Sequence, residues 1–328
     1  MLWFRTPEKV YFKKGCMPVA LHELKTVYQK KRALLITDRT LYRNGALTPV
    51  EKLLDEIQIQ HTAYFAVDKS AEMNVVQEGV KAAALFEPDV ILAVGGSDVM
   101  HTAKLIRVLY EVPQADVAEL SKRFGDIRSR EVLFPRTDRK ASLVIVPTAS
   151  GTGEEVTPYA TVNDGAAVYT IADYEVMPEF VVIDSDYMIS QTREQIAAAA
   201  KTALAHLISA YESPSATEYT DGFVVKSMES IVRFLPGYLE KGADDPIGCE
   251  KLAEASAMSG IAYANTEMAD AASVEALADK MLQNACEDQT LLLRCRDLAY
   301  AIGISGTDDK ETVVKLIERI KALAALCG

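Results

Sequence analysis

The chain has 328 residues, of which 49% are apolar and 25% charged, as expected for a globular protein large enough for two domains. The formal net charge of -12 argues against nucleic acid or an anionic membrane surface as a partner. The five cysteines are scattered and form no C-x-x-C pair, and no N-terminal stretch is long and apolar enough for a signal peptide or a membrane span. We therefore expect a reduced, cytoplasmic protein without a disulfide framework or a zinc cluster.

Short β-branched runs alternate with helical patterns through the first half of the chain. The alternation predicts an α/β domain with a mostly parallel, Rossmann-like sheet, in which ligands bind outside the carboxyl ends of the strands. Helical periodicity is clear over 50–57 and 75–86. The predicted strands are 32–37, 61–67, 89–94, 142–147 and 180–184.

After Asp184 the pattern is helical throughout, with breaks at Pro214, 242–246 and 303–306. We therefore predict an α/β nucleotide-binding domain over 1–184 and an all-helical domain over 185–328. The predicted helices of the second domain are 193–211, 221–241, 246–263, 270–284, 289–301 and 309–326.

The stretch "DVILAVGGSDVMHTAK" (89–104) is the most informative one for nucleotide binding. A buried strand leads into Gly95 and Gly96, and a helix follows from Ser97. Glycines let a pyrophosphate approach the backbone, and the helix N-terminus offers free N–H groups. The same residues also fit a plain strand–turn–helix corner in which Ser97 or Asp98 is the N-cap.

Two more stretches follow the ends of predicted strands. "PTASGTGEEVTPYA" (147–160) supplies small hydroxyl residues and glycines, but its G-x-G lacks the third glycine of a dinucleotide fingerprint. The carboxylate of Asp38 suits a ribose 2′-hydroxyl, although an Asx turn or a helix cap is the other interpretation. In the first of these stretches the candidate cofactor-binding residues are Thr148, Ser150, Gly151 and Thr152.

Together these stretches resemble the iron-containing alcohol dehydrogenases, and more closely the alcohol dehydrogenase half of the bifunctional aldehyde–alcohol dehydrogenases. The resemblance covers nearly the whole chain in order. It implies a nucleotide-binding domain followed by a helical domain, and NAD(P)-dependent reduction of aldehydes with a divalent metal. It rests on "LWFRTPEKVYF", "AVGGSDVMHTAK", "PTASGTGEEVTPYATV", "IADYEVMPEFVVID", "SGIAYAN" and "LAYAIGI".

The nucleotide motif departs from the family pattern G-G-G-S-P-M-D. Here the third glycine is Ser97, the serine is Asp98 and the aspartate is His101. Asp98 brings a negative charge to the place where a pyrophosphate would rest, so either the cofactor binds weakly or Asp98 turns away as a helix cap. We expect NAD binding to be possible but weakened.

The metal motif departs further. The resemblance implies an aspartate and a histidine at i and i+4, then H-x-x-x-H on another helix and a histidine in a P-H-G loop. Here His206 matches the histidine, Thr202 replaces the aspartate, and P-H-G occurs nowhere. The family's intervening helices and last helices have no counterpart in this sequence. We expect iron or zinc to be absent and His206 to be a remnant.

The H-x-x-x-H positions fall within "ADAASVEALADKM" (269–281) in one of two registers, and the sequence does not decide between them. One register gives Ala272 and Ala276, and the other gives Glu275 and Asp279. In the second, Glu275 and His206 could form a sparse metal site. Alternatively, Glu275 and Asp279 are solvent-facing charges on an amphipathic helix.

These departures lead to three functional hypotheses. The first is a pseudoenzyme that acts by association, as a homo-oligomer or in co-assembly with an aldehyde–alcohol dehydrogenase relative, because those relatives assemble into filaments. The second is an active NAD-dependent alcohol dehydrogenase that reduces small aldehydes with an altered metal site. The third is a module that senses NAD(H) without chemistry.

Overall fold

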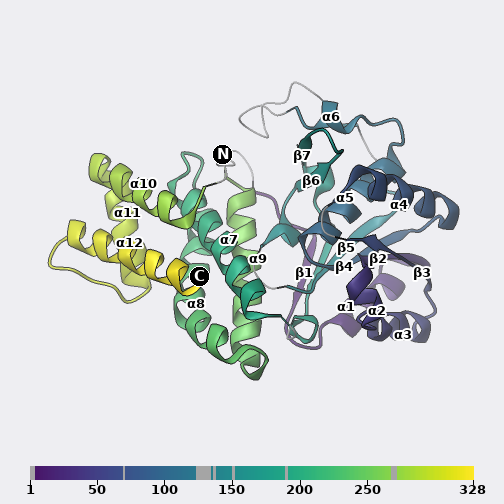
Figure 1. The fold of residues 1–328 in the computed structure, drawn as a ribbon, viewed down its shortest axis with the longest axis horizontal. Helices are drawn as coiled ribbons and strands as arrows, with labels where there is room; N and C mark the ends of the chain where they lie inside the picture. Colours follow the sequence, from purple (N-terminus) through teal and green to yellow (C-terminus); the bar gives the residue numbers. More distant parts are fainter. Residues whose placement is uncertain are drawn as a thin grey trace. The chain divides into compact units, whose positions relative to one another are not determined.

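The computed structural model describes residues 4–68, 71–122, 134–135, 138–149, 152–188, 191–266 and 272–328 (Figure 1). The chain divides into two compact units. The sheet unit is formed by Thr6–Thr148 and Glu154–Met188, and the helical unit by Met1–Arg5, Ala149–Gly153 and Ile189–Gly328. The main division therefore falls at 188/189 rather than at 184/185. Two short stretches from earlier in the chain also belong to the helical unit, so the two units are not separated by a single boundary.

The sheet unit is built on a six-stranded sheet in which all pairs of strands are parallel. The strand order is β1-β8-β5-β4-β2-β3, and the predicted parallel α/β architecture is confirmed. The central strands are buried on both faces because their residues are apolar almost without interruption. The strands are β1 (Lys9–Phe12), β2 (Arg32–Asp38), β3 (Gln60–Val67), β4 (Val90–Gly95), β5 (Ser142–Pro147) and β8 (Phe180–Ile183).

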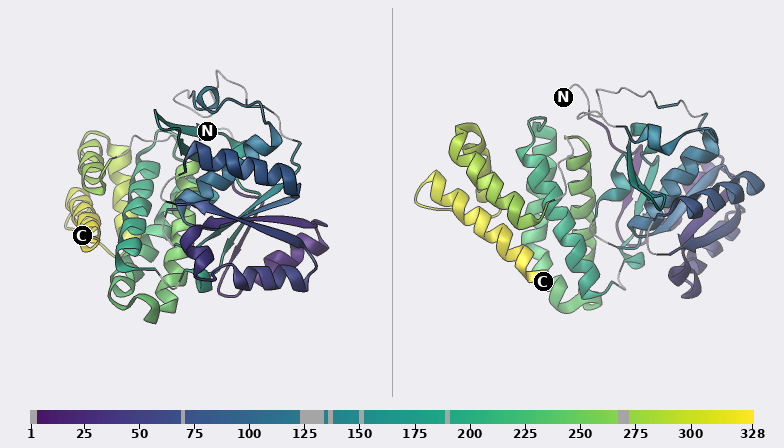
Figure 2. Two further views of the ribbon diagram at one scale, coloured as in Figure 1. Left: turned by 45° about the vertical axis from the view of Figure 1, so that its right-hand side comes forward. Right: turned by 45° about the horizontal axis from the view of Figure 1, so that its top comes forward.

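Helices cover both faces of this sheet (Figure 2). On one face, α1 (Met17–Thr26) and α3 (Thr48–Glu56) pack on alternate strand residues such as Leu35. On the other face, α4 (Met73–Phe86) and α5 (Ser97–Glu111) pack on the residues in between, such as Ile36. The short helices α2 (Arg39–Arg43) and α6 (Val117–Leu120) lie in the connections. This two-sided covering separates the chain that leaves β2 from the chain that leaves β4.

Three strands were not predicted from the sequence. β1 is a short edge strand that pairs with β8. The other two form the antiparallel hairpin of β6 (Tyr159–Asn163) and β7 (Val168–Ala172). Three single turns of 3-10 helix complete the sheet unit, namely η1 (Glu154–Val156), η2 (Tyr174–Val176) and η3 (Ser185–Tyr187). η1 and the first residues of β6 lie in the stretch 147–160, which the sequence marked only as a candidate cofactor loop.

All six predicted helices of the second half are present in the helical unit, coloured from green to yellow in Figure 1. The helix predicted from residue 270 begins at Val274 instead, because the Ser273 hydroxyl caps it by accepting from the N–H of Ala276. None of the described helices is both long and apolar enough to cross a membrane. The helices are α7 (Arg193–Glu212), α8 (Glu218–Lys241), α9 (Pro246–Ala264), α10 (Val274–Glu287), α11 (Gln289–Ala301) and α12 (Asp309–Leu326), with a 3-10 turn, η4 (Gly242–Asp244), after α8.

Specific contacts fasten the two short stretches to the helical unit. The side chain of Asn265, just after α9, accepts from the N–H of Arg5 at 2.8 Å and donates to its carbonyl oxygen at 2.7 Å. Gly153 crosses Gly260 of α9 so closely that a Cβ on Gly260 would lie 2.1 Å from the Gly153 carbonyl oxygen. Two glycines therefore meet here because no side chain fits between the two backbones.

Candidate functional site

The topology of the sheet marks one position at its carboxyl edge. β2 and β4 are neighbours, with Ile36 opposite Ala93. The chain after β2 continues into α2 and α3 on one face of the sheet, whereas the chain after β4 continues into α5 on the other. Ligands of doubly wound sheets bind where neighbouring connections diverge in this way. Asp38 and Gly95 stand at this switch point.

Two glycines form the turn from β4 into α5, and their surroundings differ. A Cβ on Gly95 would lie 2.5 Å from the Val99 side chain, so only glycine allows α5 to start this close to the strand. A Cβ on Gly96 would meet nothing within 4 Å. Gly96 is the N-cap and Ser97 the first helical residue, so the expectation of Ser97 or Asp98 as N-cap is wrong. The first turn of α5 thus has no side-chain cap.

Asp38 is a helix cap in this structure. Its carboxylate accepts a hydrogen bond of 2.8 Å from the backbone N–H of Leu41, at the start of α2. The local interpretation of this residue is therefore confirmed. One carboxylate oxygen serves the helix, and contact of Asp38 with a ribose stays a prediction.

A carboxylate from η1 lies along the first turn of α5. The Oε1 atom of Glu154 is 3.4 Å from Nε2 of His101, and the Ser97 hydroxyl hydrogen-bonds the same carboxylate. Burial opposes ionisation of Glu154, yet His101, Ser97 and Lys104 together lower its pKa to about 2. Glu154 therefore carries a negative charge at ordinary pH. The sequence drew no attention to this residue.

Asp98 points to a different partner from the one expected. Its carboxyl accepts from the backbone N–H of Ala71, so it does not act as the cap of α5. Burial raises the pKa of Asp98, the charge on Glu154 raises it further, and His101 opposes both. The start of α5 therefore holds two acidic side chains next to one imidazole.

Lys104 ties α5 to the segment that carries Glu154. Its side chain is fully buried, and its Nζ donates to the carbonyl oxygens of Glu154, Thr157 and Tyr159 at 2.8, 2.8 and 2.9 Å. Three carbonyls suit the three N–H bonds of an ammonium group. Burial lowers the pKa of Lys104 to about 7, and burial raises the pKa of the neighbouring Glu155 to about 7.

The remaining candidate cofactor residues are divided between the two units. Thr148 follows β5 in the sheet unit, and its N–H donates to the carbonyl of Gly95 at 3.2 Å. Thr152 belongs to the stretch assigned to the helical unit. Ser150 and Gly151 lie outside the described residues. The structure thus brings together Asp38, Gly95, Gly96, Ser97 and Thr148 at the carboxyl edge of one sheet.

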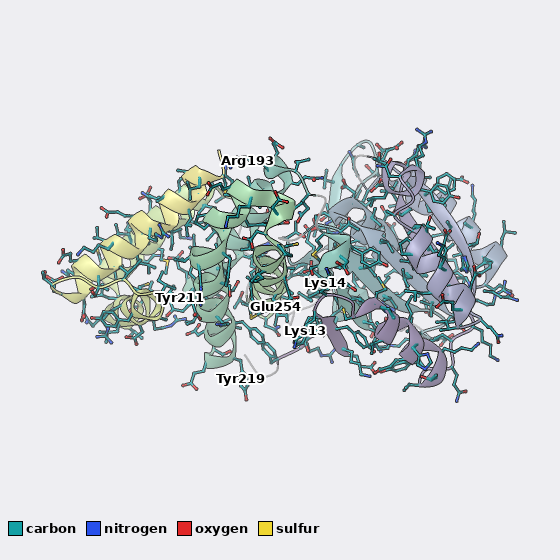
Figure 3. All side chains as sticks on the ribbon, turned by 90° about the horizontal axis from the view of Figure 1, so that it is seen from below. Lys13, Lys14, Arg193, Tyr211, Tyr219 and Glu254 are labelled. Atoms are coloured by element: carbon teal, nitrogen blue, oxygen red, sulfur yellow. The ribbon has the colours of Figure 1, made fainter. Side chains whose placement is uncertain are left out.

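The predicted metal-ligand positions lie in the helical unit. Thr202 and His206 are one turn apart on α7, the helix that runs between the labelled Arg193 and Tyr211 in Figure 3. The Thr202 hydroxyl donates to the carbonyl of Ala198, one turn back on its own helix, at 3.2 Å. The His206 ring stacks on Tyr263 of α9, with ring centroids 4.2 Å apart. Both side chains are thus engaged within the bundle.

The structure places the residues of both registers in the α10 region. Ala272 lies just before the first helical residue and Ala276 lies within α10, and which register matches the family's histidine pair stays a prediction. Glu275 and Asp279 share α10, and both are exposed. Asp279 forms an ion pair with Lys321 of α12. Within the ranges that the structure describes, no three His, Cys, Asp or Glu side chains converge as a metal site would require.

The family is decided by two models that match the chain in order. The model "Iron-containing alcohol dehydrogenase" matches residues 7–185, and "Fe-containing alcohol dehydrogenase family, C-terminal" matches residues 196–280. The chain belongs to the iron-containing alcohol dehydrogenase family.

Curated relatives of this alcohol dehydrogenase-family chain are larger proteins. The aldehyde-alcohol dehydrogenase of Clostridium acetobutylicum is 38% identical over 267 residues, which is 81% of this chain and 31% of that protein. The bifunctional aldehyde-alcohol dehydrogenase of Escherichia coli is 36% identical over 267 residues, 81% of this chain and 30% of the relative. The matched region thus spans about a third of the length of these relatives.

Solved structures of the family share the fold. The iron-containing alcohol dehydrogenase of Thermococcus thioreducens superposes with a TM-score of 0.86 at 23% identity, over 99% of this chain and 86% of that one. A 1,3-propanediol oxidoreductase gives a TM-score of 0.85 at 22% identity, over 100% and 87% of the two chains. At this identity the likeness shows the fold alone.

The residues at the family's metal positions do not fit a divalent ion. A neutral hydroxyl that donates to its own helix brings no charge to a metal, and a ring stacked on tyrosine is held by that contact. Glu275 is exposed on α10. At the nucleotide position the backbone shape fits a dinucleotide, but the charge does not, because Asp98 and Glu154 both lie at the first turn of α5.

Proposed function

We propose that this member of the iron-containing alcohol dehydrogenase family does not carry out metal-dependent hydride transfer with aldehydes. The observation that carries the proposal concerns Thr202, which stands where the family resemblance implies a carboxylate ligand. Its hydroxyl donates a hydrogen bond to the carbonyl oxygen of Ala198 instead. His206 alone is a poor divalent site, because zinc and iron sites of enzymes use three or more protein ligands. Without a Lewis acid, several kcal/mol of transition-state stabilisation is missing.

Metal analysis tests this proposal directly. The protein is incubated with Fe(II) or Zn(II), desalted and analysed for metal, beside His206→Ala and the control His22→Ala, which changes an exposed histidine of α1. We expect far less than one metal ion per chain in all three proteins. One ion per chain that is lost only in His206→Ala contradicts the proposal.

Turnover gives a second readout. NADH oxidation with small aldehydes, in the presence of either metal, should give a flat trace, since loss of the metal reduces the rate by orders of magnitude. Metal-dependent activity that His206→Ala abolishes would instead support a working alcohol dehydrogenase with an altered site.

Association is the activity that we propose in place of catalysis, as a homo-oligomer or with an aldehyde-alcohol dehydrogenase relative. One observation favours it. β1 is at the edge of the sheet, pairs with β8 on one side, and carries the half-exposed Phe12. The backbone groups on the open side of an edge strand are not paired within its own sheet and can pair with a second chain. Size exclusion with light scattering, alone and with the E. coli relative, should show a species larger than a monomer. A strict monomer that ignores the relative rules this activity out.

A further inference from the structure

We infer that Glu154 is an internal anion that takes the place of a nucleotide phosphate at the N-terminus of α5, so that the chain excludes dinucleotides. The inference concerns the sheet unit only. It goes beyond the loss of the metal and does not depend on it, because the metal positions lie in the helical unit.

The N-terminus of α5 has the features of an anion site. The helix is 15 residues long, its N-cap is a glycine with open space around it, and it starts at the switch point of the sheet. Free N–H groups and the helix dipole give such a terminus a partial positive charge. An anion is therefore stabilised here, whatever its source.

Glu154 supplies that anion from within the chain. Its carboxylate accepts from the hydroxyl of Ser97, the first residue of α5, and lies 3.4 Å from the imidazole of His101, one turn further on. A hydroxyl group has a single hydrogen to donate. The Ser97 hydroxyl and the His101 imidazole, on this side of the helix, therefore already face a carboxylate.

The carboxylate is also held in place by its own main chain. The carbonyl oxygen of Glu154 accepts from the buried ammonium of Lys104 at 2.8 Å, and Lys104 binds Thr157 and Tyr159 as well. Movement of the Glu154 main chain away from α5 would break its contact with the fully buried side chain of Lys104. An incoming pyrophosphate would therefore meet a fixed negative charge, with the carboxyl of Asp98 beside it.

Removal of the negative charge of Glu154 should allow the N-terminus of α5 to bind a dinucleotide. Glu154→Gln keeps the size of the side chain and removes the charge. Glu154→Ala also leaves His101 and Ser97 free to face an added anion. The control Glu56→Gln removes one exposed carboxylate from α3 in the same unit and changes the net charge equally.

The experiment measures binding of NADH by its fluorescence, with inorganic pyrophosphate as competitor. Wild type and Glu56→Gln should not bind at millimolar NADH. Both Glu154 variants should bind NADH at least about tenfold more tightly than wild type. The reason is that repulsion between two close negative charges weakens binding by about this factor. Pyrophosphate should displace NADH from both variants. Wild-type binding as tight as in the variants overturns the inference, and so does absence of binding in all four proteins.

A measurement on the unaltered protein covers variants that fail to fold. With carboxyl-labelled glutamate, the carbon resonance of Glu154 should stay in its ionised position through pH 4.5, because its pKa is lowered to about 2. Titration near 4.5 would mean that the carboxylate is not held by Ser97 and His101, and would overturn the inference. None of these readouts involves metal or turnover, so their failure leaves the proposed function standing.

Discussion

The contacts of the Glu154 carboxylate with His101 and Ser97 give this residue an effect on stability in acid. Its pKa falls from 4.5 to about 2 in the folded chain, so the folded state favours the ionised form. The resulting stability is present above pH 4.5 and is lost as the pH falls from 4.5 to 2. A pKa shift of this size corresponds to about 3 kcal/mol in the free energy of unfolding. Glu154→Gln should therefore lose less stability than wild type between these pH values, in urea unfolding followed by circular dichroism.

The control for this prediction is again Glu56→Gln. Its carboxylate is exposed on α3, so this variant should lose stability in acid in parallel with wild type. Parallel acid profiles for wild type and Glu154→Gln would show that His101 and Ser97 do not stabilise the charge.

Residue-level prediction from the sequence succeeded where the cause was local. Asp38 precedes a short helix, and the helix-cap alternative follows from the preference of aspartate for that position. The contact of Glu154 with α5 had no such signal, because His101 and Glu154 are brought together only when β5 and η1 fold beside β4. Charge type and spacing do not say which of many carboxylates reaches a given helix end.

Two elements cross at Gly153 and Gly260, and the crossing gives a prediction at the scale of elements. Gly260→Ala would place a Cβ 2.1 Å from the Gly153 carbonyl oxygen, so either α9 or the loop must shift. We expect a loss of about 2 kcal/mol in the free energy of unfolding. The matched control is Gly222→Ala within α8, where a Cβ meets nothing within 4 Å. That change should be neutral or stabilising, because alanine favours a helix.

Urea unfolding of both glycine variants checks this prediction. Equal stability of Gly260→Ala and Gly222→Ala would mean that the two backbones separate without cost.

Elements with a strong apolar pattern could be predicted, and weakly patterned ones could not. β4 and β5 are continuous apolar runs, and the helices of the second half have clear periodicity. β1 has four residues and a partly exposed face, so its pattern is too short to detect. The β6–β7 hairpin did carry a signal, since Asp164-Gly165 is a favoured turn pair between two β-rich runs.

The start of α10 shows the same dependence on local chemistry. The periodic pattern of the sequence extends back to residue 270. The helix nevertheless begins only at Val274, because the Ser273 hydroxyl caps its N-terminus. The preference for serine at the N-cap was the available signal in the sequence.

At the scale of the whole molecule, Asn265 joins positions 260 residues apart. It is 2% exposed, and its amide bonds both backbone groups of Arg5. Asn265→Ala leaves those groups without these partners, so we expect a loss of about 2 kcal/mol in unfolding free energy. The control Gln283→Ala, on the exposed face of α10, should change stability little. Similar unfolding curves for the two variants would show that the N-terminal stretch adds nothing to the stability of the helical unit.

The division of the molecule was only partly visible in the sequence. The change from alternating to helical patterns places the main boundary within a few residues. The assignment of Met1–Arg5 and Ala149–Gly153 to the helical unit depends on contacts with α9 and the residue that follows it. Such contacts between distant segments leave no periodic trace in either one.

The internal position of the Glu154 carboxylate has a consequence for how this protein responds to its surroundings. A protein that binds a free ligand is stabilised by about 2.7 kcal/mol when the ligand is present at a hundred times its dissociation constant. That gain disappears when the ligand is scarce. Glu154 is covalently part of the chain, so the anion beside Ser97 and His101 is present at all times. The thermal stability of the sheet unit should then stay constant while the cellular supply of dinucleotide rises and falls.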